Sequence, residues 1–446
     1  MKTVRIGCGA GFAGDRIDPA IELATKGDLH YLVFECLAER TIALAQQAKA
    51  RDPSLGYDSM LVARMKAVLR PCRAGRTVII TNMGAANPQA AAVVVRDLAR
   101  ELGLRGLSIA AVTGDDVKDR IDLDDYIVNE TGMPVRSLGD RLVSANAYIG
   151  AEPILQALQQ KADVVITGRA ADPSLFVAPL AHEHRWDLDS WPEVGRATLV
   201  GHLLECAGQI SGGYFADPGV KDVPALDTIG FPLAEVPERG PFVITKVAGS
   251  GGTVTPATCK EQLLYEIHDP AAYLTPDTIA DFGHVRVESL AADRVLVDGA
   301  TGRQRPDRLK VSLAYRAGFI GEGQISYAGA GADGRARLAA DVVVQRLART
   351  GVQTSEIRCD LIGVSALHGP RLSSTGSSPY EVRLRVAAHT DTLADAQAVA
   401  NEVESLYTNG PAGGGGATKT TREVLAVAST FIARELVKPA VSMEVV

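Results

Sequence analysis

The chain has 446 residues, a length that predicts two to three domains of about 150 residues each. Its 46 Lys and Arg against 53 Asp and Glu give a formal net charge of -7, which argues against a surface for nucleic acid or for an anionic membrane. Hydrophobic residues make up 46% and charged residues 22%, values that exclude a disordered chain.

The sequence predicts neither a membrane span nor a targeting segment. The longest aliphatic run, Ala90 to Val95, is far shorter than the roughly 20 residues that cross a bilayer. The N-terminus leads directly into an apolar strand and lacks the apolar region of a signal peptide. The six cysteines are scattered without a Cys-x-x-Cys pair, which argues against a disulfide scaffold or a zinc ribbon. We therefore expect a cytoplasmic protein.

Short apolar segments alternate with helical patterns through the first half of the chain. Strands are expected at 3–7, 31–34, 77–81, 107–112 and 164–167, and helices at 19–26, 39–49, 59–69, 88–102 and 154–160. Apolar strands flanked by helices are typical of a parallel sheet that is buried on both faces. The pattern predicts a doubly wound α/β domain over residues 1–195, with a mostly parallel sheet and helices on both faces.

The rest of the chain predicts a smaller, mixed α+β region towards the C-terminus. A second domain is expected over 196–375 and a third segment over 376–446. Their expected helices are 198–209, 336–349 and 393–406, and their expected strands are 242–245, 285–287, 294–297, 309–315, 381–387 and 424–432. The last segment contains a glycine-rich run from Gly410 to Gly416, which predicts either a lid or floor of a site or a flexible loop. A P-loop is not expected, because Thr418 replaces the second glycine and a strand follows.

Polar side chains follow four of the predicted strands at the point where each strand ends. In an open parallel sheet, ligands bind beyond the carboxyl ends of the strands. The candidate substrate-binding residues at these ends are Asp15, Arg16, Asn82, Asn87, Asp115, Arg169 and Asp172. The alternative is that they are turn and helix-cap residues, which Asp and Asn commonly are. We expect Arg16 and Arg169 above all to face one cavity, because a buried guanidinium needs partners.

A glycine pattern follows the first predicted strand and fits a dinucleotide-binding loop, with an acidic residue about 20 residues later for the ribose. Its residues are Gly9, Gly11, Gly14 and Glu35. Two features depart from that pattern: the helix starts late, at Asp18-Pro19, and Asp15 would repel a phosphate. A bound dinucleotide is therefore an alternative. Otherwise the cofactor is unknown, and no metal is expected.

The predicted helix 198–209 carries His202, Glu205 and Cys206 on one face, at spacings of three and four residues. A His, a carboxyl and a thiol on one face predict a proton-transfer pair or a nucleophile with its base. The alternative is a buried structural cysteine beside a hydrogen-bonded histidine. Further along, Lys246 and Ser250 lie in a strand, glycine loop and helix pattern, which predicts either an anion cradle or a tight turn.

The segments described so far resemble the acyclic terpene utilisation family, AtuA. The matching stretches are 9–16, 82–88, 168–173, 198–217, 245–255 and 410–416. The resemblance implies a role in the bacterial breakdown of branched or terpenoid carbon skeletons, beside acyl-CoA pathway enzymes. It implies neither a particular reaction nor a set of catalytic residues.

Such a pathway needs hydration, dehydration or carbon–carbon cleavage next to a carbonyl, each with a general acid and base. Glu205 with His202 would supply that pair, and Arg16 with Arg169 would hold a substrate carboxylate. The leading hypothesis is a lyase or hydratase for a small anionic or CoA-linked substrate. The alternatives are an NAD(P)-dependent oxidoreductase and a non-catalytic ligand-binding partner of a pathway enzyme. A homo-oligomer is expected on general grounds.

Overall fold

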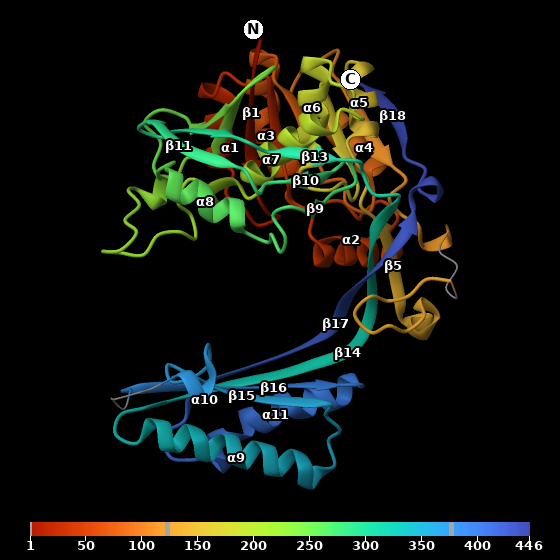
Figure 1. Ribbon diagram of the computed structural model, residues 1–446. Helices are drawn as coiled ribbons and strands as arrows, with labels where there is room; N and C mark the ends of the chain where they lie inside the picture. Colours follow the sequence, from red (N-terminus) through yellow and green to blue (C-terminus); the bar gives the residue numbers. More distant parts are fainter. Residues whose placement is uncertain (1, 121–124, 374–378) are drawn as a thin grey trace. The chain divides into compact units, whose positions relative to one another are not determined.

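The computed structural model describes residues 2–120, 125–373 and 379–446 (Figure 1). The chain divides into two compact units: a larger unit, Met1–Ala314 with Val427–Val446, and a smaller unit, Tyr315–Ala426. The expected division into 1–195, 196–375 and 376–446 does not coincide with these units. Residue 195 lies inside helix α7 (Trp191–Leu204), and residue 375 lies outside the described residues.

The larger unit is built on a mixed sheet, which contains ten strands among the described residues, in the order β11-β12-β8-β7-β1-β2-β3-β6-β4-β18. The strands are β1 (Thr3–Ala10), β2 (Tyr31–Phe34), β3 (Val78–Thr81), β4 (Ser108–Thr113), β6 (Val164–Thr167), β7 (Pro232–Pro237), β8 (Phe242–Lys246), β11 (Arg286–Ala291), β12 (Arg294–Asp298) and β18 (Ala440–Val445). Strands β1, β2, β3, β6 and β4 pair in parallel, and the pairs outside this set are antiparallel.

The strands and helices expected in the first half of the chain are present. The helices of the larger unit include α1 (Asp18–Lys26), α2 (Glu39–Arg51), α3 (Leu61–Gly75), α4 (Pro88–Glu101), α5 (Glu152–Gln159), α6 (Ser174–His184) and α8 (Pro256–Leu264). Strands β2 and β6 are buried along their whole length, as their apolar sequences predict. The α/β prediction is confirmed, whereas a mostly parallel, doubly wound sheet with helices on both faces is not confirmed.

The smaller unit follows a β-α-β-β-α-β order. Its elements include β14 (Arg308–Ala328), α9 (Ala332–Thr350), β15 (Glu356–Ile362), β16 (Glu381–Thr390), α11 (Leu393–Asn409) and β17 (Gly415–Ala433). The sheet order β15-β16-β14-β17 and this connectivity are those of a split β-α-β, or ferredoxin-like, arrangement. Helices α9 and α11 lie on the same face of the sheet (Figure 1), where they share an apolar core with it.

Glycine allows α11 to approach the sheet of the smaller unit closely. A Cβ atom on Gly321 would lie 2.0 Å from the carbonyl oxygen of Ala396, and one on Gly323 would lie 2.4 Å from the Cβ atom of Val403. The run that begins at Gly410 joins α11 to β17, so the strand expected after it is confirmed. Within the described parts of the chain, every helix is too short or too polar to cross a membrane.

Candidate functional site

The larger unit contains a cavity of about 670 Å³. Residues that follow the parallel strands β1, β2 and β6 contribute to its wall, at the carboxyl ends where ligands of such sheets bind. Charged side chains are unusually frequent in the wall, with six carboxyl groups and three cations. They are Glu35, Glu39, Asp172, Glu205, Glu266, Asp307, Arg169, Arg308 and Lys310.

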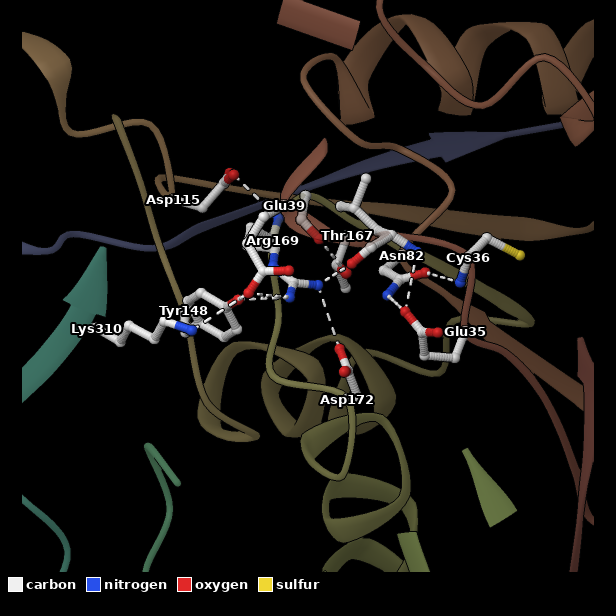
Figure 2. Close-up of polar contacts among 12 residues, drawn as sticks. Glu35, Cys36, Glu39, Asn82, Asp115, Tyr148, Thr167, Arg169, Asp172 and Lys310 are labelled. Atoms are coloured by element: carbon white, nitrogen blue, oxygen red, sulfur yellow. Dashed lines mark hydrogen bonds and ion pairs between the residues drawn. The ribbon is translucent and has the colours of Figure 1, made fainter. Parts of the chain in front are cut away.

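Arg169 lies at the centre of the polar contacts (Figure 2) and is only 2% exposed. Its Nη1 atom donates to the carbonyl oxygen of Leu37 and lies 3.2 Å from Oδ1 of Asp172. Its Nη2 atom donates to the hydroxyl oxygen of Tyr148 at 2.7 Å, and the guanidinium lies 4.1 Å from the centre of the Tyr148 ring. A buried cation with these partners is held in one orientation.

Asp115 fixes the backbone of Arg169 from outside the cavity. Its Oδ2 atom accepts hydrogen bonds from the backbone N–H of Arg169 at 3.0 Å and from the side-chain amide of Asn146 at 2.9 Å. A Cβ atom on Gly168 would lie 2.3 Å from Oδ1 of Asp115, so glycine is required for this contact. Burial raises the pKa of Asp115 to about 6. Asp115 is thus a support for Arg169 rather than part of the cavity wall.

Tyr148 joins Arg169 to a second ion pair. Its hydroxyl group donates to Oε1 of Glu39, which also lies 3.2 Å from Nζ of Lys310. Burial raises the pKa of Glu39, but the charge of Arg169, the hydrogen bond from Tyr148 and the charge of Lys310 outweigh it and lower that pKa to about 2. Glu39 therefore remains ionised and acts as a counterion for the two cations.

Glu39, Tyr148 and Lys310 were not predicted as site residues from the sequence. Tyr148 follows strand β5 (Leu142–Ala147), which was not predicted. Glu39 is the first residue of α2, the next helix after β2, so a search of the segment that follows this strand would have included it. Lys310 lies in β14, and nothing local in the sequence places it beside a loop from the first half of the chain.

Glu35 is held in the wall by Asn82. The amide oxygen of Asn82 accepts from the backbone N–H of Cys36 at 2.8 Å, and its Nδ2 atom donates to Oε1 of Glu35 at 2.9 Å. Burial, followed by the negative charge of Asp172, raises the pKa of Glu35 to about 8. Glu35 therefore holds a proton at neutral pH. Asn82 does not line the cavity itself, but it fixes the position of Glu35, which does.

Glu205 and His202 form a buried pair whose protonation follows from their partners. Nε2 of His202 lies 3.1 Å from the carbonyl oxygen of Leu263, which only accepts, so Nε2 carries the hydrogen. Burial lowers the pKa of His202 to about 4, so the ring is neutral and its Nδ1 atom is an acceptor. Oε1 of Glu205, 3.1 Å from Nδ1, must then donate. Burial and the charges of Asp172 and Glu266 raise the pKa of Glu205 well above its usual value, which agrees with a protonated carboxyl group.

The remaining predicted residues in the wall differ in their suitability for chemistry. Burial raises the pKa of Asp172, and the charge of Arg169 partly offsets this. Burial also raises the pKa of the Cys206 thiol, which therefore stays protonated and is a poor nucleophile. Oε2 of Glu205 is buried and has no hydrogen-bond partner among the described residues. Glu205 is thus the predicted catalytic residue that the geometry favours most.

The family model of the acyclic terpene utilisation family protein AtuA matches residues 4–443. The chain belongs to the acyclic terpene utilisation family, AtuA. The family resemblance expected from the sequence is therefore confirmed. Comparisons with curated proteins and with solved structures find no match.

Arg16 of this AtuA family member is not among the residues that line the cavity, contrary to the expectation that it would face Arg169. Its Nη1 atom donates to the carbonyl oxygens of Leu226 at 3.0 Å and Asp227 at 3.2 Å. Asp15 accepts from the backbone N–H groups of Gly11 and Arg16, each at 2.9 Å. Asp15 thus stabilises its own loop, which is the turn role weighed as the alternative, and Arg16 joins that loop to the segment that contains Leu226.

The glycine pattern of this loop does not fit a bound pyrophosphate. The backbone N–H of Gly11 is occupied by Asp15, and α1 starts only at Asp18, so no helix N-terminus follows Gly14 directly. A Cβ atom on Gly11 would lie 2.5 Å from the carbonyl carbon of Cys206, and one on Gly9 would meet the ring of Phe34 at 2.7 Å. Gly9 and Gly11 therefore allow close packing of the chain. Glu35, predicted to bind a ribose, lines the same cavity as Arg169.

Three predicted residues lie elsewhere in the AtuA fold. Asn87 caps α4, because its side chain accepts from the backbone N–H of Ala90 at 3.4 Å. Nζ of Lys246 donates to the carbonyl oxygen of Ser250 at 2.7 Å and lies 3.1 Å from Oδ2 of Asp293. Asn87 is therefore a helix cap. Lys246 and Ser250 contact each other and are not among the residues that line the cavity. Across residues 2–120, 125–373 and 379–446, no three His, Cys, Asp or Glu side chains are grouped to hold a metal ion.

Proposed function

We propose that this protein is an enzyme of branched-chain or terpenoid carboxylate breakdown, and that it acts as a lyase or hydratase in the cavity around Arg169. The proposal rests on the AtuA membership, which supports the pathway, and on one observation in the cavity. That observation is Glu205, a buried carboxyl group that must donate to His202 and whose second oxygen is unpaired among the described residues.

Lyases and hydratases need one group that gives a proton and one that takes a proton, at the same pH. Enzymes meet this need by placing two titratable groups in environments that separate their pKa values. Glu205 is kept protonated by burial and by the charges near it. Burial raises the pKa of Asp172, and the positive charge of Arg169, 3.2 Å away, partly offsets this and favours the carboxylate. Glu205 is therefore the acid of the proposed reaction and Asp172 is the base.

In the hydration direction, Asp172 takes a proton from water, and the oxygen of that water forms a bond to the β-carbon of an α,β-unsaturated substrate. The electron pair of the double bond moves towards the carbonyl, and Glu205 delivers its proton to the α-carbon. The reverse sequence is dehydration. The carbonyl oxygen gains negative charge on the way, and Arg169 and the protonated Glu35 are the donors that stabilise it.

His202 acts as a positioning residue for this acid. Its Nε2–H is held by Leu263, and the amide of Gln262 donates to the backbone carbonyl oxygen of His202 at 2.9 Å. The ring also stacks on Phe282, with centres 5.8 Å apart. A ring fixed in this way keeps Nδ1 directed at Glu205.

The test is turnover of branched α,β-unsaturated acids and of their CoA thioesters by the purified protein, followed by chromatography of the hydroxy product. Glu205→Gln keeps the shape of the side chain and removes the transferable proton, so we expect the rate to fall by about 10²–10⁴-fold with an unchanged circular dichroism spectrum. Glu238→Gln changes an exposed residue outside the cavity and is the matched control. An undiminished rate in Glu205→Gln would refute the role of Glu205.

A further inference from the structure

We infer that two copies of this chain associate through strand β17 of the smaller unit, paired antiparallel about a two-fold axis at Thr421. The sheets of the two smaller units then join into one. This inference does not depend on the proposed reaction, and it gives the homo-oligomer expected from the sequence a definite interface. It is carried by the exposure of β17, by the direction of its backbone groups and by the order of its charges.

Strand β17 has an open edge. It lies at one end of the sheet order β15-β16-β14-β17, so within the described chain only one of its two edges is paired with a strand. The six residues from Thr418 to Glu423 are all exposed, whereas in β16, inside the same sheet, only Glu381 is exposed. A long exposed edge is a template for another strand, and proteins commonly shorten it, cover it or interrupt it with proline. Residues 418–423 contain three threonines, which favour extended structure, and no proline.

The backbone of β17 presents unpaired groups at this edge. In a strand, the N–H and C=O groups of successive residues point alternately to the two edges. The N–H of Ala417 donates to the hydroxyl oxygen of Tyr407 at 2.9 Å, and the N–H of Ser429 donates to a carboxylate oxygen of its own unit at 2.8 Å. Both donors therefore point away from β14, and so do the odd-numbered residues between them. The outward groups of Lys419 and Thr421 have no partner among the described residues, and a second strand would supply one.

The charges of this segment favour a second copy of the chain as the partner. Lys419 and Glu423 lie on either side of Thr421, each two residues away from it. In an antiparallel pair centred on Thr421, Lys419 of each copy lies opposite Glu423 of the other, which forms two oppositely charged pairs. Within one chain, Oε2 of Glu404 lies 2.5 Å from Nζ of Lys419, and Arg316 lies 3.4 Å from Glu423. Association therefore links existing ion pairs of the two chains into one network.

Other registers lack this complementarity. An axis at Arg422 places that residue opposite itself, and an axis at Lys419 or Glu423 also opposes like charges, which is destabilising. An axis at Thr420 brings no opposite charges directly together. An axis between two residues would oppose an outward-facing residue to an inward-facing one and would break the hydrogen-bond ladder. The charges thus specify one register and disfavour pairing with unrelated strands.

The first test is the molar mass of the full-length protein in solution, measured by sedimentation equilibrium. We expect twice the mass of one chain at micromolar concentration. Thr421→Pro removes an outward N–H and no bond to β14, so it should weaken the association by at least about hundredfold. Thr421→Ala keeps the backbone N–H and is the matched control, which should associate like the wild type. A monomeric wild type, or a Thr421→Pro protein with the wild-type mass, would overturn the inference.

The register is tested by cross-linking, in a Cys359→Ser background that removes the exposed native thiol. Directly opposite residues of a hydrogen-bonded antiparallel pair have Cα atoms about 5.5 Å apart, a distance that a disulfide spans. Thr421→Cys should therefore form an interchain disulfide under mild oxidation. Thr420→Cys lies opposite Arg422 of the other copy and should not, which makes it the matched control. Equal cross-linking of the two variants would contradict the register.

A charge exchange tests the partner without altering the backbone. Lys419→Glu and Glu423→Lys, each alone, place like charges opposite each other and should weaken the association by about tenfold. The double variant should recover it. Such a recovery cannot come from within one chain, because each new side chain meets Glu404 or Arg316 with the same charge. Single variants that associate like the wild type, or a double variant that does not recover, would each refute pairing between two copies at this edge.

Discussion

Replacing Glu35 with glutamine should remove a large part of the pH dependence of the stability of the larger unit. Burial, followed by the charge of Asp172, raises the pKa of Glu35 from an ordinary value of 4.5 to about 8. The folded state therefore holds this proton more tightly than the unfolded state. The stability that the proton provides is fully present below pH 4.5 and is lost as the pH rises through about 8. Since one pKa unit corresponds to about 1.4 kcal/mol, the loss reaches at most about 5 kcal/mol.

A glutamine side chain at position 35 would have the shape of the protonated acid and would not ionise. Its side-chain oxygen would still accept from the backbone N–H of Leu37 and from Nδ2 of Asn82, both now 2.9 Å from Oε1 of Glu35. The variant and the wild type should therefore have similar stability near pH 5. Near pH 9 the variant should be more stable by up to about 5 kcal/mol.

Urea unfolding followed by tryptophan fluorescence measures this difference. Trp186 and Trp191 both lie in the larger unit, so the fluorescence reports on the part of the chain that contains Glu35. Glu238→Gln removes an exposed carboxyl group and should follow the wild type at every pH. Parallel stability curves for Glu35→Gln and the wild type between pH 5 and 9 would show that Glu35 does not hold its proton in the folded protein.

Three further substitutions test the supports of the site and of the smaller unit. Gly168→Ala places a Cβ atom 2.3 Å from Oδ1 of Asp115 and should destabilise the larger unit by about 1–3 kcal/mol, measured by thermal unfolding. Tyr148→Phe removes the hydroxyl group that donates to Glu39, so the pKa of Glu39 should rise from about 2, as followed by NMR titration of its carboxyl group. Gly323→Ala forces α11 away from the sheet and should lower the unfolding temperature of the smaller unit, while tryptophan fluorescence of the other unit stays unchanged.

The first half of the fold was predictable because the signal for its strands is local. A run of three or four apolar residues between helical segments identifies a strand buried on both faces, and the bounds of β2 and β6 were predicted to the residue. The antiparallel half depends on contacts between distant parts of the chain. Strand β18, for example, comes from the last residues and pairs with β4, which lies in the first third of the sequence. No period in the local sequence specifies such a partner.

The residues of the cavity wall were predictable to a similar extent and for a similar reason. Arg169 and Asp172 follow a buried strand, and Glu205 lies at the end of a helix, so local patterns were sufficient to select them. The same pattern selected Arg16, which instead binds backbone carbonyl groups of its neighbouring loop. A polar residue after a strand has the same sequence signal whether it closes a turn or faces a ligand. Tertiary contacts alone separate the two, as they do for Lys310.

The protonation states of the carboxyl groups in the cavity wall depend on one another, because these groups share few cations. Glu35 and Glu205 are buried carboxyl groups in the cavity wall, Asp172 is a partly exposed one, and Arg169 is the buried cation in the same wall. If all three ionised, two negative charges would remain without a counterion in a medium of low dielectric constant, so two protons are retained instead. The protein thereby carries, at neutral pH, carboxyl groups that donate hydrogen bonds and one carboxylate that accepts them. A cavity selected for stability alone would replace these groups with apolar side chains, because buried ionisable groups cost folding free energy. Their cost to the fold is therefore an argument in favour of the proposal that this cavity has a function.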